Sequence, residues 1–163
     1  MREKIEPGAA SVTERLRLLS AARARGMHGG IMAMPILPGL SDSQSQIESL
    51  VRDAADAGAQ FVCFGGLTLR PGRQKDYYYG VVQRHWPELL AGYERAYGRG
   101  LPSGAPDARF TQKVTRRYAE ALSKHGLSAR IPRASFRGFV PVYGRGRAAR
   151  TRRDRGRVGR KVD

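Results

Sequence analysis

The sequence is poor in cysteine, in acidic residues and in long apolar runs. Its one cysteine among 163 residues, Cys63, excludes an internal disulfide and any site that takes three or four thiolates from this chain. A single thiol also favours a reducing compartment, and we expect a cytoplasmic protein. No apolar run approaches the roughly 18 residues of a membrane span. The first eight residues lack the apolar core of a secretory signal.

Basic residues are abundant and unevenly placed. The chain has 30 Lys and Arg against 14 Asp and Glu, a formal net charge of +16. Residues 144–163 are rich in arginine and contain no aromatic residue, so we expect a disordered basic tail there. Such a tail attracts nucleic acid without sequence preference, unless it is simply solvated. A small basic nucleic-acid-binding protein is therefore one candidate function.

Hydrophobic spacing predicts alternating helices and strands in the first seventy residues. The expected elements are a helix over 12–25, a strand over 30–37, a helix over 43–57 and a strand over 60–69. Ser11 with Glu14 has capping-box spacing at the first helix. At the second helix, Ser43 and Ser45 both begin such a box. Strand, helix and strand in this order indicate one unit with parallel strands.

The pattern changes after residue 70. Helices are expected over 76–84, 87–97 and 108–125. Residues 131–143 have β-like content that is interrupted by Pro132 and Pro141. The order of elements therefore predicts an α/β protein with a helical C-terminal extension.

Five stretches resemble one family in the same order along the chain. They are KIEPGAASVTERLRLLSAARARG, MAMPILPGLSDS, AGAQFVCFGGLTLRPGRQKDYYY, HWPELLAGYERAYG and IPRASFRGFVPVY. From Lys4 to Tyr143 the chain resembles the C-terminal portion of the spore photoproduct lyase-like (DNA repair photolyase-like) family of the radical S-adenosylmethionine superfamily. The resemblance implies the C-terminal part of a partial (β/α)6 barrel over residues 4–74. A helical extension over 75–143 and the tail 144–163 would follow.

The resemblance also implies radical chemistry. Members of the family use a 4Fe-4S cluster to cleave S-adenosylmethionine reductively to a 5′-deoxyadenosyl radical, and DNA photoproduct repair is one reaction it implies. A CxxxCxxC loop holds that cluster, and this sequence has no such loop. We therefore expect this chain to be a C-terminal fragment that is inactive alone. It is a truncated gene product, a split subunit whose missing N-terminal half carries CxxxCxxC, or a sequence whose start is miscalled at Met1.

The end of the chain departs from the family. Family members continue after the last shared stretch into an acidic, leucine-rich helix, whereas Tyr143 is followed here by arginine and glycine repetition. We hypothesise a frameshift near codon 144. Translation of the other two reading frames tests this, because one of them should encode the acidic helix.

The resemblance places a cofactor contact at the end of the first strand. Pro35, Ile36, Leu37, Pro38 and Gly39 match the strand end that packs on the adenine of S-adenosylmethionine in the superfamily. Sites in such folds form at the carboxyl ends of strands. The alternative is an ordinary tight turn between a strand and a helix.

Cations follow the second predicted strand and should lie at the same edge. Arg70, Arg73, Gln74 and Lys75 suit a phosphate-bearing substrate such as DNA, or the carboxylate of the cofactor. The alternative is a solvated loop.

Other side chains are better explained by packing or solvation. Tyr77–Tyr79 can stack on bases, but their spacing favours the core. Lys113 and its neighbours on the long helix suit a solvated face, and Cys63 suits inert core packing. The three histidines lack metal-ligand spacing, so no metal ligand is predicted.

Overall fold

The computed structural model describes residues 2–6, 8–98 and 100–136, and the chain divides into two compact units, Met1–Pro132 and Arg133–Asp163. The first unit holds α1 (Arg2–Ile5), α2 (Val12–Ala24), β1 (Ile31–Ile36), α3 (Gln44–Asp56), β2 (Val62–Gly66), α4 (Arg73–His85), η1 (Pro87–Leu89), α5 (Leu90–Tyr97) and α6 (Ala108–Lys124). In the second unit, the described residues form the short helix η2 (Arg133–Phe136). The rest of the predicted β-like run, the tail 144–163 and the proposed frameshift lie outside the described residues.

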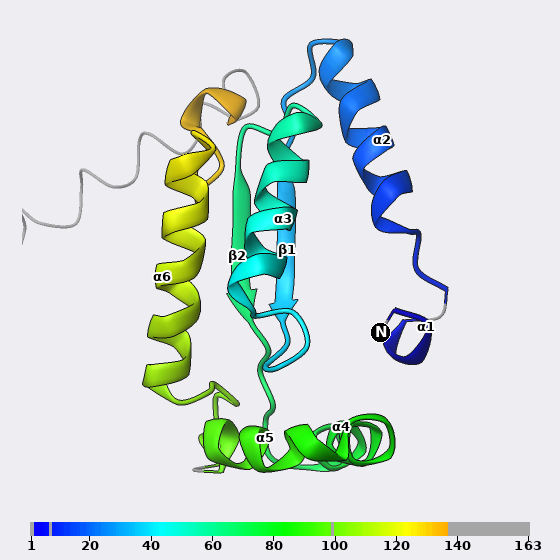
Figure 1. The fold of residues 1–163 in the computed structure, drawn as a ribbon, viewed down its shortest axis with the longest axis vertical. Coiled ribbons are helices and arrows are strands. Elements are labelled where there is room, and N and C mark those ends of the chain that lie inside the picture. Colours follow the sequence, from blue (N-terminus) through cyan, green and yellow to red (C-terminus); the bar gives the residue numbers. More distant parts are fainter. Residues whose placement is uncertain (1, 7, 99, 137–163) are drawn as a thin grey trace, which may run out of the picture. The chain divides into compact units, whose positions relative to one another are not determined.

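The predicted partial (β/α)6 barrel is wrong. The sheet that the described residues form has two strands, β1 and β2, and helices make up most of the remaining structure (Figure 1). A barrel closes only when each strand has a neighbour on both edges. Here β2 is followed by the helices α4, α5 and α6. The smaller prediction, one strand–helix–strand unit with parallel strands, is confirmed.

Side-chain capping sets where α2 and α3 begin. The Ser11 hydroxyl accepts the Glu14 N–H at 3.2 Å, and the Glu14 carboxylate accepts the Ser11 N–H at 2.7 Å, which confirms the predicted capping box. Ser43 and Gln46 form the equivalent box before α3. Each box satisfies backbone donors that a helix end leaves without partners.

The main core lies between the sheet and the helices α3 and α6. Its buried residues are Ala33, Ile36, Ile47, Val51, Ala54, Ala59, Val62, Val114, Tyr118, Ala121 and Leu122. Phe64 of β2 stacks on Tyr118 of α6 with ring centroids 4.3 Å apart. Full burial of a Val or Ile side chain contributes about 1.5–3 kcal/mol. Ile47 and Val51, 1% and 0% exposed, therefore attach α3 to the sheet.

A second cluster forms at the carboxyl end of the strands, where α4 and α5 pack together (Figure 1). Its buried residues are Leu69, Val82, Tyr93 and Tyr97. The Tyr78 hydroxyl lies 3.0 Å from the Tyr93 hydroxyl, and Tyr79 donates to the Tyr93 carbonyl at 3.1 Å. The predicted packing role is therefore confirmed for Tyr78 and Tyr79, whereas Tyr77 is exposed.

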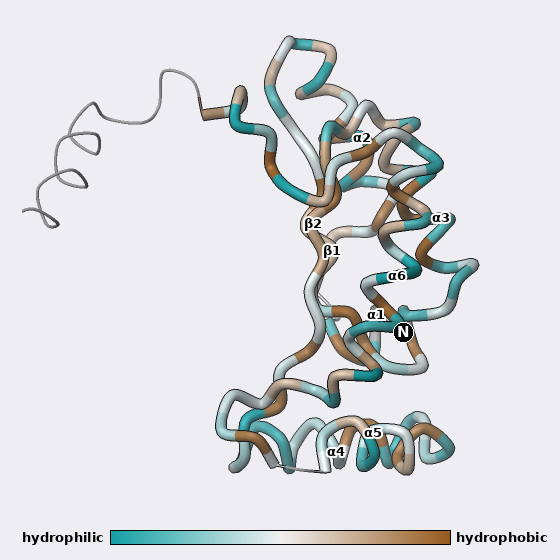
Figure 2. Tube along the Cα trace, turned by 90° about the vertical axis from the view of Figure 1, so that its left-hand side faces the viewer, coloured by the Kyte–Doolittle hydropathy of each residue, from teal (hydrophilic) through white to brown (hydrophobic). Residues whose placement is uncertain are grey.

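The opposite face of the sheet is open. Figure 2 shows α3 and α6 on one side of the strands. Met32 and Met34 point to the other face, where they are 58% and 48% exposed. Cys63 pairs with Met32 in the register and shares this face half-buried, so it is not a core residue. Between α2 and β1 an apolar groove of about 810 Å³ remains.

Candidate functional site

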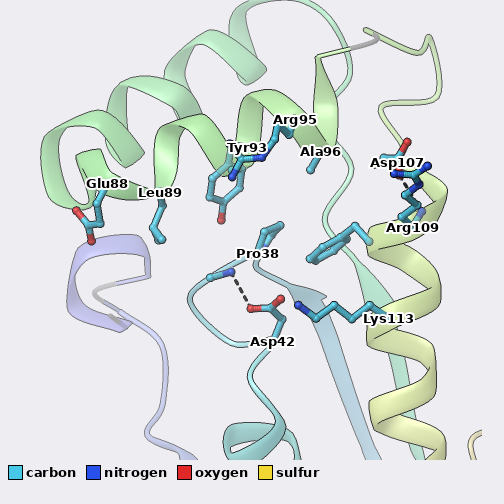
Figure 3. A pocket seen from close by; sticks show the side chains of 13 residues that line it. Pro38, Asp42, Glu88, Leu89, Tyr93, Arg95, Ala96, Asp107, Arg109 and Lys113 are labelled. Carbon is cyan, nitrogen blue, oxygen red and sulfur yellow. Dashed lines mark hydrogen bonds between the residues drawn. The ribbon is translucent and has the colours of Figure 1, made fainter.

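A cavity of about 720 Å³ lies at the carboxyl end of β1 (Figure 3). Three segments line it: the turn from β1 to α3, the η1–α5 region, and the first turns of α6. Ligands of open α/β sheets bind outside the carboxyl ends of the strands. The volume is within the range of small-molecule sites, roughly 300–1,000 Å³. This cavity, the strand-end pocket, is the candidate site.

The turn after β1 is held by its own hydrogen bonds. The Leu37 N–H donates to the Ser41 hydroxyl at 2.8 Å, and the Gly39 N–H donates to the Asp42 carboxylate at 2.7 Å. Gly39 has a φ of 73°, which favours glycine, and an added Cβ would lie 2.8 Å from a Leu89 methyl carbon. The turn therefore approaches η1 closely because this position has no side chain.

Arg117 connects the same turn to α6. Its guanidinium donates to the Asp42 backbone carbonyl and lies 3.8 Å from the Asp42 carboxylate. Both side chains are largely buried, at 20% and 15% exposed. The carboxylate of Asp42 lines the pocket, but it already accepts a backbone N–H and faces a cation. It therefore positions the turn rather than serving as a free base.

Three further cations line the strand-end pocket. They are Arg95 of α5 and the pair Arg109 and Lys113 of α6. In the part of the chain that the structure describes, none of the three belongs to a salt bridge. Figure 3 shows Lys113 extending from α6 toward the side of the pocket that holds Asp42.

Tyr93 of the pocket wall stays neutral at physiological pH. It is 1% exposed, and burial, followed by its hydrogen bond with Tyr78, raises its pKa far above the ordinary value of 10.0. Tyr97, which does not line the pocket, belongs to the buried cluster of α4 and α5, and burial raises its pKa as well. Its hydroxyl donates to the Leu67 carbonyl at 2.9 Å. The neutral phenol of Tyr93 shapes the pocket wall.

The five residues predicted to contact a cofactor are divided between two cavities. Pro38 and Gly39 line the strand-end pocket. Pro35, Ile36 and Leu37 line the apolar groove beside α2 instead, and the last two are buried. The turn therefore faces both cavities, and cofactor binding at these residues stays a prediction.

The four residues predicted to bind phosphate line neither cavity. Arg70, Arg73 and Gln74 are exposed beyond the end of β2. Lys75 donates to the Tyr97 carbonyl at 3.1 Å and lies 5.4 Å from the Tyr79 ring centre, so it supports the α4–α5 packing. Phosphate binding by these residues stays a prediction.

The sequence did not indicate the cations that line the pocket. Lys113 was expected on a solvated face, and its side chain is exposed, but it also lines the pocket. Arg95 and Arg109 were not among the predicted site residues. The signal in the sequence was weak: Arg109 and Lys113 have the spacing of one helix face, but so do many solvated pairs.

The described residues do not fit an iron–sulfur cluster. Such clusters are held mainly by several cysteine thiolates, and Cys63 is the one cysteine of the chain. Residues 2–6, 8–98 and 100–136 contain no group of three or more His, Cys, Asp and Glu side chains that could hold a metal ion. The same ranges contain no helix long and apolar enough to cross a membrane.

Comparison with known proteins finds relatives in mycobacteria. The chain is 33% identical over 141 residues to the uncharacterized protein Rv2578c of Mycobacterium tuberculosis and, to the same extent, to the uncharacterized protein Mb2609c of Mycobacterium bovis. The matched region is 85% of this chain and 40% of each relative, so the chain spans less than half the length of these relatives. No family model and no solved structure matches the chain.

Proposed function

We propose that this chain is the substrate-binding C-terminal part of a longer radical S-adenosylmethionine enzyme of the spore photoproduct lyase-like kind. The observation that carries the proposal is the strand-end pocket, because its wall contains Pro38 and Gly39 of the stretch that resembles the family. The greater length of the mycobacterial relatives supports a larger protein.

In this proposal, the residues of this chain bind and orient the substrate. S-adenosylmethionine supplies radical chemistry when it is bound beside a reduced cluster, and this chain holds no ligands for that cluster. The backbone donors of Leu37 and Gly39 are already used within the turn, so Pro38 and Gly39 offer an apolar surface to the organic part of a substrate. The pocket volume of about 720 Å³ accommodates such a group.

The cluster would come from the remaining part of the longer enzyme, which would carry CxxxCxxC and pack on the open face of the sheet, either joined to this chain or as a separate polypeptide. Met32 and Met34 are exposed there, and the apolar groove adjoins them. An exposed apolar patch of this kind is typical of an interaction surface. The remaining part of the enzyme is the favoured occupant because 60% of each relative lies outside the matched region.

Anaerobic co-expression tests the proposal. The chain is expressed with the polypeptide encoded by the upstream sequence that contains CxxxCxxC, and the purified complex is analysed for iron, sulfide and formation of 5′-deoxyadenosine. We expect all three in the complex with the unchanged chain, and loss of the complex with Met32→Glu. Tyr77→Glu is the matched control, because Tyr77 is exposed on α4 away from the sheet. Absence of an iron-containing complex would refute the proposal.

A second candidate function is nucleic-acid binding by the chain alone. The net charge of +16 favours it. The expected result is micromolar binding to duplex DNA that weakens steeply between 50 and 200 mM salt, as counterion release predicts. Fluorescence anisotropy with the full chain and with a chain that ends at Tyr143 checks this. Equal binding by both would place the interface before residue 144, and binding that ignores salt would exclude an electrostatic interface.

A further inference from the structure

Three cations from two helices face one cavity. Arg109 and Lys113 are four residues apart on α6, which places them on the same side of that helix. Arg95 faces the same space from α5. Helices α5 and α6 are separate in the chain, so the tertiary structure brings these charges together.

The carboxylates of the pocket leave these cations unpaired. Asp42 is engaged by the Gly39 N–H and by Arg117. Asp107 accepts the Arg109 backbone N–H at 2.8 Å and caps the start of α6. Glu88 lies on the η1 side of the pocket, across from α6 in Figure 3. On the α6 side, the two cations Arg109 and Lys113 outnumber the single carboxylate of Asp107, so that side carries a net positive charge.

The remaining wall is apolar. Pro38, Leu89 and Phe110 line the space between the cations and η1. Phe110 precedes Lys113 by one helical turn, so a ligand held by the lysine also meets the ring. A volume of about 720 Å³ exceeds the needs of a bare ion and suits an ion with an organic body.

We propose that the strand-end pocket binds a phosphate monoester that carries an aromatic or apolar group. Lys113, Arg109 and Arg95 hold the phosphate oxygens, and Phe110 with Leu89 packs on the organic group. This inference rests on the proposed function in taking the ligand as a substrate of the longer enzyme. The binding itself requires only this chain.

Calorimetric titration of the full chain tests the site. The probes are phenyl phosphate, inorganic phosphate and phenol. We expect phenyl phosphate to bind more tightly than inorganic phosphate, and phenol not to bind. Lys113→Ala and Arg109→Ala should each weaken phenyl phosphate binding roughly tenfold, because each removes a charge-assisted hydrogen bond. Glu88→Gln should tighten binding, because it removes a negative charge from the wall.

Arg116→Ala is the matched control. Arg116 is on the same helix and 76% exposed, outside the pocket, and its removal changes the net charge as Lys113→Ala does. Equal weakening by Arg116→Ala and Lys113→Ala would overturn the proposal, because it would mean diffuse attraction to a basic protein. Absence of phenyl phosphate binding at millimolar concentration would overturn it as well.

The source of the phosphate is distinguished by a second pair of probes. A short oligonucleotide with a 5′-phosphate is compared with the same oligonucleotide without it. We look for tighter binding of the phosphorylated form, and for loss of this difference in Lys113→Ala. Both results together would support the site and identify a nucleic-acid end as the source of the phosphate. If phenyl phosphate binds and the two oligonucleotides do not differ, the site takes a small molecule. An iron-containing complex in the co-expression experiment, without phenyl phosphate binding here, would overturn this inference and leave the proposed function intact.

Discussion

Gly39 illustrates how one position determines the shape of the pocket wall. Its φ of 73° and its close approach to Leu89 both require the absence of a Cβ. The same residue donates its N–H to Asp42, which Arg117 joins to α6. The turn, η1 and α6 therefore depend on one another at this point.

Gly39→Ala should lower the free energy of unfolding by about 1–2 kcal/mol, the cost of an L-residue in the left-handed region. Urea unfolding followed by circular dichroism measures the difference. Gly80→Ala is the matched control: Gly80 lies inside α4 with no neighbour within 4 Å of an added Cβ. That change should raise stability by about 0.5–1 kcal/mol. Equal effects of the two substitutions would contradict the assigned geometry.

Glu48 carries the pH dependence that the structure predicts. A hydrogen bond from Lys124, followed by one with His125, lowers the pKa of Glu48 below its ordinary value of 4.5. A carboxyl group whose pKa is lowered on folding stabilises the protein above the unfolded pKa and loses this effect as the pH falls through the folded pKa. Glu48→Gln should therefore lower stability at pH 7, and the difference from the unchanged chain should shrink at pH 3. Urea midpoints at the two pH values check this, and a constant difference would contradict it.

At the scale of elements, α3 depends on its N-terminal cap and its apolar stripe. The sequence offered two capping boxes, from Ser43 or from Ser45. The structure uses Ser43 with Gln46, while Glu48 bonds to α6 instead. Because the Glu48 carboxylate bonds to Lys124 and His125, it does not complete a capping box with Ser45, and the box of Ser43 with Gln46 forms instead.

Ser43→Ala should destabilise the chain by about 1 kcal/mol, because the N–H of Gln46 loses its acceptor. Ser45→Ala is the matched control, because the Ser45 hydroxyl makes only a 3.4 Å contact with Ser43. We expect a change within about 0.5 kcal/mol for the control. Thermal unfolding followed by circular dichroism compares the two variants, and a larger effect at Ser45 would show that the other box is formed.

At the scale of the whole molecule, one face of the sheet is packed and the other is open. The packed face holds Val62 and Phe64 against α3 and α6. The open face presents Met32 and Met34. A two-stranded sheet is marginal by itself, and its stability here depends on the helices that cover one face.

The open face should bind an apolar dye. We expect the chain to enhance the fluorescence of anilinonaphthalene sulfonate and Met32→Glu to lower it, because the substitution places a charge at the centre of the exposed patch. The dye is anionic and the chain is basic, so Tyr77→Glu serves as the control for the change in charge. Equal loss with both variants would assign the signal to charge instead of to the sheet.

Local structure was largely predictable because its causes lie within a few residues. Ser11 with Glu14, and Ser43 with Gln46, mark helix starts by hydrogen bonds that span three residues. Gly58, with a φ of 79°, follows α3, and glycine is the residue that this position after a helix favours. The apolar runs indicated β1 and β2, and their connection through a helix required parallel pairing.

The number of strands in the sheet could not be predicted in this way, and the predicted partial barrel is wrong. Strand number depends on which segments pair at each edge of a sheet, and pairing joins residues that are distant in the chain. A run such as 131–143 has strand-like composition, yet residues Arg133–Phe136 form η2. The family resemblance implied the C-terminal part of a partial (β/α)6 barrel, whereas the described residues form one pair of strands beside several helices.

By itself, the sequence determined the caps, the strand–helix–strand unit and the excess of positive charge. Only the tertiary structure decided which charges face a cavity. Arg70 and Arg73 come after β2 and line neither cavity, whereas Arg95 and Lys113 are on two helices, far apart in the chain, whose packing places both at the strand-end pocket. The reason is physical: capping and periodicity act over a few residues, whereas the convergence of side chains depends on how whole helices pack.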